Sequence, residues 1–289
     1  MLGALWLASC GAPSPFQADS EPQREWPEPS PALWEATSPD GAKGWLFGTV
    51  HALPDGVEWN SGALNEAIES ADLLMVEIAD LDASTQAAIE FESRAYSDGL
   101  EPLPRRVGPE YSQAIAKLID DADMEESDFA RTETWAAALM LGNAMRCTQS
   151  GNGVDRALIA QFERVQAMEG FAMQFDIFDN LPEEAQGQLL LTAAQSGDCE
   201  RAFDRTELWL TGDTVALMQE LESSFGGNTD LRLDLLERRN EWFAARLARY
   251  QELNPDEAVL LAVGAGHMPG PDGVVALLEA EGYTVTRIQ

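Results

Sequence analysis

Histidine and cysteine are scarce in this chain of 289 residues, which has two histidines, His51 and His267, and three cysteines. The HExxH and paired CxxC signatures are absent, which excludes the common zinc patterns. The GxSxG elbow and the GxxxxGK[ST] loop are also absent, which excludes the usual serine-hydrolase nucleophile and a P-loop. Any hydrolytic site must therefore be built from other residues.

Basic side chains are also few. Lysine and arginine number 18 against 50 aspartates and glutamates, so the formal net charge is −32. Such a surface repels nucleic acid and anionic membranes, and we expect no nucleic-acid partner. No stretch of about 18 apolar residues appears, so the sequence predicts no membrane-spanning helix. A hydrophobic share of 45% with 24% charged residues is typical of a globular chain and excludes wholesale disorder.

The first thirty residues have the pattern of a signal peptide followed by a tether. Residues 1–9 are largely apolar, and Leu7-Ala-Ser-Cys10 has the form of a lipobox, which predicts a signal peptide and lipidation of Cys10. This leader is short and lacks a basic start, so we interpret it as truncated. Six prolines crowd residues 11–31 and predict an extended tether over residues 10–31. The alternative is a ragged terminus with an incidental cysteine.

Residues 32–289 have the pattern of a single α/β domain. Strands are predicted at residues 45–50 and 73–78 with a helix near 61–70 between them, and again at 259–263 and 283–288 around a helix at 272–281. Each of these βαβ-like units carries a GxxH motif after its first strand, Gly48-Thr-Val-His51 and Gly264-Ala-Gly-His267. The strands lack polar alternation, which favours a central, mixed or mostly parallel sheet covered on both faces. The middle is mainly helical, with helices predicted at residues 155–164, 182–195, 200–210, 213–224 and 231–252 and a short strand at 165–168.

Four polar residues follow the predicted strands. In open α/β sheets ligands bind beyond the carboxyl ends of the strands, where His51, Glu77, Glu169 and His267 would meet. Glu77 stands in the run Leu-Leu-Met-Val-Glu-Ile, where a carboxylate is costly unless it is paired or metal-bound. Arg239 lies on the apolar stripe of the last long helix and requires an anionic partner. Glu77 is therefore either a functional group or a structural ion-pair partner of Arg239.

Several segments together resemble the TraB/GumN family, which is related to the animal Tiki proteins. They are Leu46-Phe-Gly-Thr-Val-His51, residues 71–77, Gly153-Val-Asp155, Met168-Glu169 with Gln174 and Gln186, Trp209-x-x-Gly212-Asp213, Arg239-Asn240 and Val263-Gly-Ala-Gly-His-Met-Pro-Gly270. The resemblance covers roughly residues 33–289 and implies an erythromycin-esterase-like fold. In the Tiki branch it implies a metal-dependent protease, with His51, His267 and Glu77 as the metal or catalytic set and Glu169 and Arg239 in support.

The function expected from this resemblance is a metal-dependent hydrolase that cleaves peptides or proteins. Two imidazoles and a carboxylate suit one divalent ion such as manganese, cobalt or zinc, and do not choose among them. Glu169 would take the proton of the attacking water, and Arg239 would hold Glu77 or the oxyanion. Two alternatives remain open: a non-catalytic lipoprotein that sequesters peptide signals, and an esterase that uses histidine and glutamate without metal.

The remaining cysteines are Cys147 and Cys199, 52 residues apart. An exported domain sits in an oxidising compartment, where a disulfide between them would persist. Two unbridged core thiols are the alternative.

The lipobox predicts an outer-membrane lipoprotein that faces the periplasm, with the acyl anchor as its only membrane contact. We expect the full-length precursor to partition into the detergent phase on phase separation and Cys10→Ser to stay soluble or uncleaved. N-terminal sequencing checks this independently, because a mature protein that starts at any residue other than Cys10 contradicts it.

Overall fold

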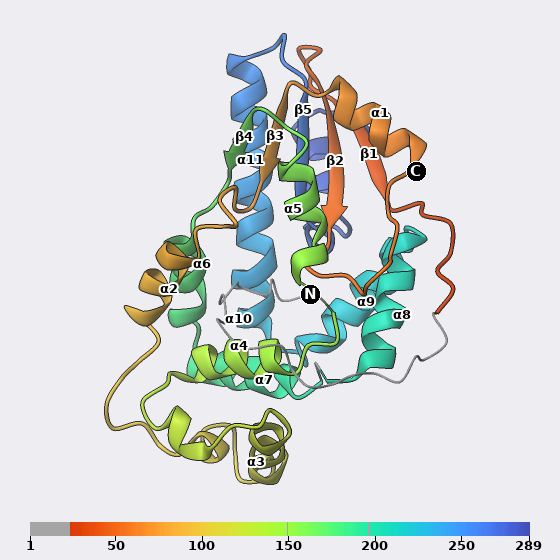
Figure 1. Ribbon diagram of the computed structural model, residues 1–289. Helices are drawn as coiled ribbons and strands as arrows, with labels where there is room; N and C mark the ends of the chain where they lie inside the picture. The colour runs from red at the N-terminus through yellow and green to blue at the C-terminus, as the bar shows by residue number, and fades with distance from the viewer. Residues whose placement is uncertain (1–23, 149, 196) are drawn as a thin grey trace.

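The computed structural model describes residues 24–289 except residues 149 and 196. A six-stranded sheet in the order β4-β3-β5-β2-β1-β6 forms the upper half of the molecule in Figure 1, and a mainly helical half lies below it. The strands are β1 (Leu33–Thr37), β2 (Lys43–Thr49), β3 (Leu73–Val76), β4 (Val165–Ala167), β5 (Val259–Gly264) and β6 (Thr284–Arg287).

The α-helices are α1 (Gly62–Ser70), α2 (Ser84–Glu92), α3 (Ser112–Asp121), α4 (Thr134–Ala144), α5 (Val154–Ile159), α6 (Phe171–Asp179), α7 (Glu183–Ala193), α8 (Cys199–Leu210), α9 (Thr214–Ser224), α10 (Thr229–Arg232), α11 (Arg238–Leu253) and α12 (Val274–Ala280). A π-helical turn, Leu233–Glu237, joins α10 to α11. Short 3-10 turns lie at Leu103–Arg105, Glu126–Phe129, Ser150–Asn152 and Ala265–His267.

The central strands of the sheet are parallel. β5 pairs with both β3 and β2, and β3 pairs with β4, all in parallel, while β1 is antiparallel to its neighbours β2 and β6. The register places Thr49 beside Gly264, and places Val76 beside both Ala262 and Ala167. Four carboxyl ends therefore meet at one edge, which faces the helical half (Figure 1).

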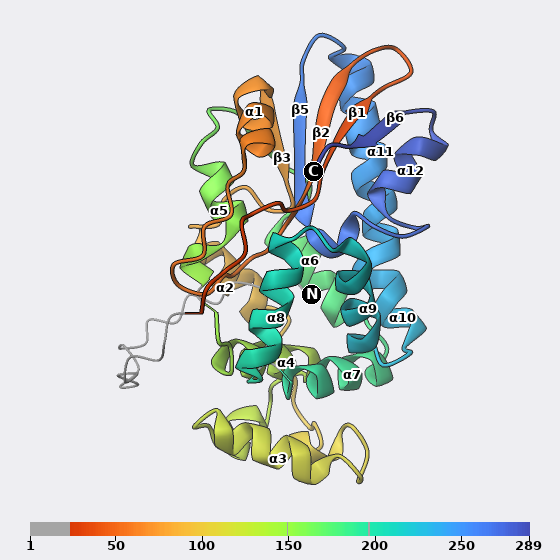
Figure 2. The same ribbon diagram turned by 90° about the vertical axis from the view of Figure 1, so that its right-hand side faces the viewer.

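Helices cover both faces of the sheet, as Figure 2 shows with α1 and α5 on one side and α11 and α12 on the other. Alternate residues of β5 serve the two faces: Val259, Leu261 and Val263 pack with α11 and α12, and Leu260 and Ala262 pack with α1 and α5. Every residue of β3 and β5 is buried, which explains why these strands are continuously apolar.

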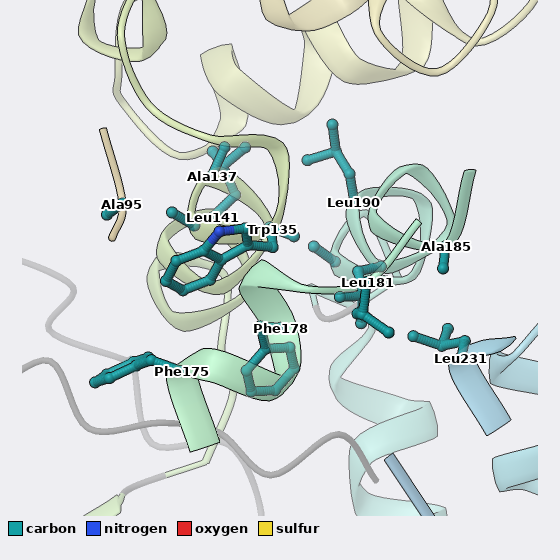
Figure 3. Packing of buried hydrophobic residues seen from close by; sticks show 14 of the residues in the cluster. Ala95, Trp135, Ala137, Leu141, Phe175, Phe178, Leu181, Ala185, Leu190 and Leu231 are labelled. Carbon is teal, nitrogen blue, oxygen red and sulfur yellow. The ribbon is translucent and has the colours of Figure 1, made fainter. Parts of the chain in front are cut away.

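The helical half has its own core around Trp135 of α4 (Figure 3). The indole stacks on Phe178 at 6.2 Å between ring centroids and lies 5.9 Å from Phe175, both on α6. Its Nε1 donates to Asp179 at 3.0 Å, so the one polar atom of this buried ring is satisfied. This core lies in the half of the molecule that the carboxyl edge of the sheet faces (Figure 1).

The α/β fold class and the helical middle segment predicted from the sequence are confirmed. Two helix boundaries differ from the predictions. The helix expected at 155–164 ends at Ile159, because the chain turns there to enter β4. The helix expected at 231–252 is interrupted by the π-helical turn just before Arg239.

The lipobox and Cys10 lie outside the described residues, as does most of the expected tether. Its last part, from Arg24 onward, packs along α8. Arg24 pairs with Asp204 at 2.8 Å and Glu207 at 3.0 Å, and Trp26 meets Phe203 edge to face. Within residues 24–289, apart from the two undescribed positions, no helix combines the length and the apolar character needed to cross a membrane.

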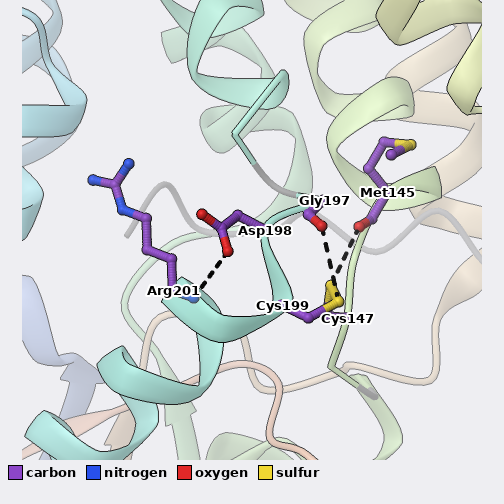
Figure 4. The surroundings of a disulfide bond; sticks show 6 residues. All are labelled: Met145, Cys147, Gly197, Asp198, Cys199 and Arg201. Atoms are coloured by element: carbon purple, nitrogen blue, oxygen red, sulfur yellow. Dashed lines mark hydrogen bonds between the residues drawn. A yellow bond between two sulfur atoms is a disulfide. The ribbon is translucent and has the colours of Figure 1, made fainter.

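A disulfide joins the end of α4 to the start of α8 (Figure 4). Cys147 and Cys199 lie 5.3 Å apart between Cα atoms, with an S–S distance of 2.04 Å. The bond links segments 52 residues apart in the sequence and so closes a long loop.

Because the loop is long, we expect Cys147→Ser/Cys199→Ser to lower the free energy of unfolding by about 3–4 kcal/mol. Urea denaturation measures this change, and the reduced wild type provides a control that should lose a similar amount. Thiol titration of denatured, non-reduced Cys10→Ser should find no free thiol, whereas two free thiols per chain would contradict the disulfide.

Candidate functional site

Each of the four polar residues predicted at the strand ends lies at the carboxyl edge of the sheet. His51 follows β2 by two residues, Glu77 comes directly after β3, Glu169 follows β4 by two residues, and His267 ends the 3-10 turn after β5. The backbone also holds these loops together, since the Glu169 N–H donates to the carbonyl of Glu77 at 2.9 Å. Arg239 reaches the same place from the first turn of α11.

Glu77 is buried and fully engaged. Its Oε1 accepts from the backbone N–H of Gly264 at 2.7 Å, and its Oε2 accepts from Arg239 Nη2 at 2.5 Å. Burial opposes ionisation of Glu77, but the charge of Arg239, helped by the charge of His51 and the Gly264 hydrogen bond, outweighs it and holds the pKa well below its usual range. Glu77 is therefore a carboxylate at neutral pH.

Arg239 forms a two-pronged bond with Glu169. Arg239 Nε and Nη2 donate to the two carboxylate oxygens of Glu169, each at 2.7 Å. The Glu169 side chain is 0% exposed and also accepts from Gln174 Nε2 at 2.9 Å. Burial opposes the charge on Arg239, but the two carboxylates raise its pKa above the usual range. The anionic partner that the apolar stripe of α11 required is thus a pair of glutamates.

His267 is a buried imidazole whose orientation is fixed on both sides. Its Nδ1 lies 2.6 Å from Asn240 Oδ1, and Asn240 Nδ2 donates to the carbonyl of Asp272 at 2.7 Å, which sets the direction of the amide. Nδ1 therefore carries the proton, and the lone pair of Nε2 faces Arg239 Nη1 at 3.2 Å. Burial and the positive Arg239 lower the pKa of His267 to about 3, so the ring is neutral.

His51 is partly exposed and has an aspartate behind it. Its Nδ1 lies 2.7 Å from Asp155 Oδ2, and the other oxygen of Asp155 accepts from Thr49 Oγ1 at 2.6 Å. The side chain of His51 is 23% exposed. Burial opposes protonation, but the Asp155 carboxylate outweighs it and raises the pKa of His51 to about 9. The two histidines therefore differ in charge at neutral pH.

Gly264 brings three of these side chains to one point. A Cβ atom on Gly264 would lie 3.1 Å from Glu77 Oε1, 3.5 Å from His267 Cδ2 and 3.7 Å from His51 Nε2. The other GxxH motif is crowded too, because a Cβ on Gly48 would lie 2.8 Å from the Cα of Ala265. Both glycines thus allow the close approach of the loops that carry the histidines.

The donor set suits a divalent ion in its chemistry, but the side chains are not placed as a ligand set in this structure. Each imidazole is held through Nδ1 by an oxygen acceptor, which leaves Nε2 toward the centre, as is usual for histidines that bind metal. His267 Nε2 lies 3.9 Å from Glu77 Oε1, within the ~4 Å that two ligands of one ion can span. Across the described residues, no three His, Cys, Asp or Glu side chains are already arranged as a ligand set, and here the Arg239 guanidinium lies against Glu77 and His267. The residues fit an ion provided that Arg239 gives up its contact with His267.

Sequence reasoning missed two partners of the histidines. Asp155 lies 104 residues from His51, and only its place in the Gly153-Val-Asp155 segment drew attention to it. Asn240 shares the apolar stripe of α11, a buried polar residue that could have indicated its role. Gln174, which donates to Glu169, was noted only as part of the family resemblance, and its contact with Glu169 was not predicted.

Comparison with known proteins bears on the whole domain. The model of the TraB/PrgY/gumN family matches residues 32–287. A curated relative, Metalloprotease TIKI2 of Danio rerio, is 40% identical over 55 residues, which cover 19% of this chain and 11% of that protein. The chain thus matches about a tenth of the relative's length, and no solved structure matches it significantly. The resemblance noted from the motifs is confirmed: the chain belongs to the TraB/PrgY/gumN family.

Proposed function

We propose that this protein is a divalent-metal-dependent hydrolase that cleaves peptide bonds at the carboxyl edge of its sheet. The observation that carries the proposal is the meeting of His51 Nε2, Glu77 Oε1 and the His267 ring around Gly264, with each imidazole fixed through Nδ1. The family and the partial match to a metalloprotease support this class of reaction.

His51, His267 and Glu77 would hold the ion. A bound divalent ion supplies an acidified water and polarises the carbonyl of the substrate. His51 is the more exposed of the two imidazoles, so substrate would approach the metal site from the side of His51. Asp155 keeps the Nδ1 proton of His51 in place and so presents Nε2 to the centre.

The surroundings of Glu169 differ from those expected of a general base. Its side chain is fully buried and both of its oxygens are bound by Arg239. We therefore assign Glu169 as a positioning residue that aims Arg239. The guanidinium, held on two carboxylates, lies beside the centre, where it can stabilise negative charge that develops on the substrate.

A metal-free hydrolase is the second candidate, and one observation favours it. The Asp155–His51 pair resembles the acid–base half of a catalytic triad, with a partly exposed Nε2. This candidate predicts that activity survives chelation, so one titration with EDTA separates the two.

The full chain, reconstituted with manganese, cobalt or zinc and then dialysed, should retain about one ion per molecule. His51→Ala, His267→Ala and Glu77→Gln should each lose the ion and the hydrolysis of a fluorogenic peptide library, because each removes a ligand. Elemental analysis measures the ion, and circular dichroism checks the fold. Glu257→Gln is the matched control, since it removes an arginine-paired carboxylate just before β5, at the opposite edge of the sheet, and should retain both properties.

A wild type that holds no more ion than His51→Ala/His267→Ala would refute the metal-dependent hydrolase. The sequestering protein considered from the sequence would then take its place if the chain still bound peptides.

Removal of Arg239 should cost much more stability than removal of an exposed arginine. Arg239→Leu leaves Glu77 and Glu169 buried without a cation, and we expect a loss of about 3–5 kcal/mol in the free energy of unfolding. Arg249→Leu, on the same helix, breaks an exposed pair with Glu252 and should cost under about 1 kcal/mol. Urea denaturation of both variants measures the difference, and equal losses would show that the buried cluster is not what holds α11 to the sheet.

A further inference from the structure

A cavity of about 200 Å³ opens beside His51. Its walls come from the loop after β2, the end of α4, α7 and α8, and they include Val50, Ala138, Leu139 and Leu189 as apolar lining. The cavity is thus continuous with the proposed catalytic centre through His51 and extends from it into the helical half.

Three arginines line this cavity in a chain with a net charge of −32: Arg146, Arg201 and Arg205. Arg201 is engaged, since it donates to Glu220 at 2.9 Å and to Gln195 at 2.6 Å. Neither the Arg146 nor the Arg205 side chain has a hydrogen bond or ion pair within the described part of the chain. The nearby Asp198 caps α8 by accepting from the backbone N–H of Arg201, and Glu220 is already held by the Arg201 guanidinium.

This lack of partners is unusual in this chain. Among the basic residues described, two others, Lys43 and Arg105, lack a side-chain hydrogen bond or ion pair, and both are exposed to solvent. Arg146 and Arg205 are half-buried instead, and they share one cavity. Burial lowers the pKa of Arg146, and burial together with the neighbouring Arg201 lowers the pKa of Arg205. Neither guanidinium thus has a hydrogen-bonded or ion-paired carboxylate among the described residues, although the chain has 50 acidic side chains; Glu220 and Asp198 act on the charge of Arg205 only from a distance.

The disulfide fixes the two arginines relative to each other. Arg146 directly precedes Cys147, and Arg205 lies on the helix that Cys199 begins. The bond in Figure 4 therefore ties together the two segments that carry the charges. This covalent link limits how far the two guanidiniums can move apart, and a site held in this way needs little rearrangement to receive an anion.

We propose that this cavity, the anion pocket, binds a carboxylate of the peptide substrate through Arg146 and Arg205, with the bond to be cleaved lying toward His51. This inference rests on the proposed function. The planar guanidinium matches a carboxylate with two parallel hydrogen bonds, and the apolar lining suits the aliphatic part that carries it. The carboxylate can belong to an acidic side chain or to the C-terminus of the peptide.

Isothermal titration of the full chain in EDTA with three peptides tests the proposal. The peptides are acetyl-Ala-Ala-Glu-Ala-Ala-amide, acetyl-Ala-Ala-Ala-Ala with a free carboxylate, and the neutral acetyl-Ala-Ala-Gln-Ala-Ala-amide. We expect at least one acidic peptide to bind about tenfold more tightly than the neutral one, and the tighter of the two identifies the source of the carboxylate.

Arg146→Gln/Arg205→Gln, and each single change to a lesser degree, should abolish this preference. Lys43→Gln/Arg105→Gln is the matched control, because it removes the same charge from exposed positions, and it should retain the preference. Equal affinity for all three peptides, binding of none, or a preference that survives in Arg146→Gln/Arg205→Gln would overturn the proposal. Because EDTA is present throughout, these results do not depend on bound metal, so this inference and the proposed metal-dependent hydrolase fail separately.

Discussion

The guanidinium of Arg239 holds the centre of this molecule together. It bridges Glu77 after β3 and Glu169 after β4, and it touches His267 after β5, so that one side chain from α11 joins three strand ends. Two carboxylates and one guanidinium sum to a single negative charge in a buried place. Such a cluster is costly to bury unless every group is satisfied, and here hydrogen bonds from Gly264 and Gln174 take up carboxylate lone pairs that the arginine leaves open. The protonated His51 beside Gly264 supplies a further positive charge next to this cluster.

The two histidines differ in burial and in protonation state. His267 is buried against Phe243 and Arg239, and its pKa of about 3 keeps it neutral. His51 stands at the mouth of the cavity with Asp155 behind it, and its pKa of about 9 keeps it charged while no ion is bound. Titratable groups whose environments push their pKa values apart are typical of sites where proton position matters. The similar GxxH motifs thus give dissimilar environments, because different helices pack against each loop.

The sequence predicted the elements that are determined by local pattern, and it did not predict those that are determined by contacts between distant segments. The apolar runs of β3 and β5 and the glycine turns after β2 and β5 predicted the sheet, its coverage on both faces and the edge at which the four polar residues meet. The helices α2, α3, α4 and α6 and the strand β1 were not predicted. Contacts across the helical core define α2, α4 and α6, α3 packs on the Leu103–Arg105 turn, and β1 is defined by its pairing with β2 and β6. The same holds for Asp155 and Asn240, whose importance comes from partners far away in the chain. The cavity that Arg146 and Arg205 line could not be predicted, because only the three-dimensional structure shows which arginines lack a hydrogen-bonded partner among the described residues.

The central strand β5 follows β2 and β3, its two neighbours in the sheet, by a long stretch of chain. β5 begins at Val259, so the two earlier strands have no shared neighbour until the chain has been made beyond that residue. Contacts between such distant segments slow folding, because the entropy cost of closing a long loop comes before the strand pairing that offsets it. A nascent chain, or one cut before residue 259, therefore carries two apolar strand edges with nothing between them. Gly264 ends this strand and His267 follows it, so the site cannot form before the chain has been made beyond β5.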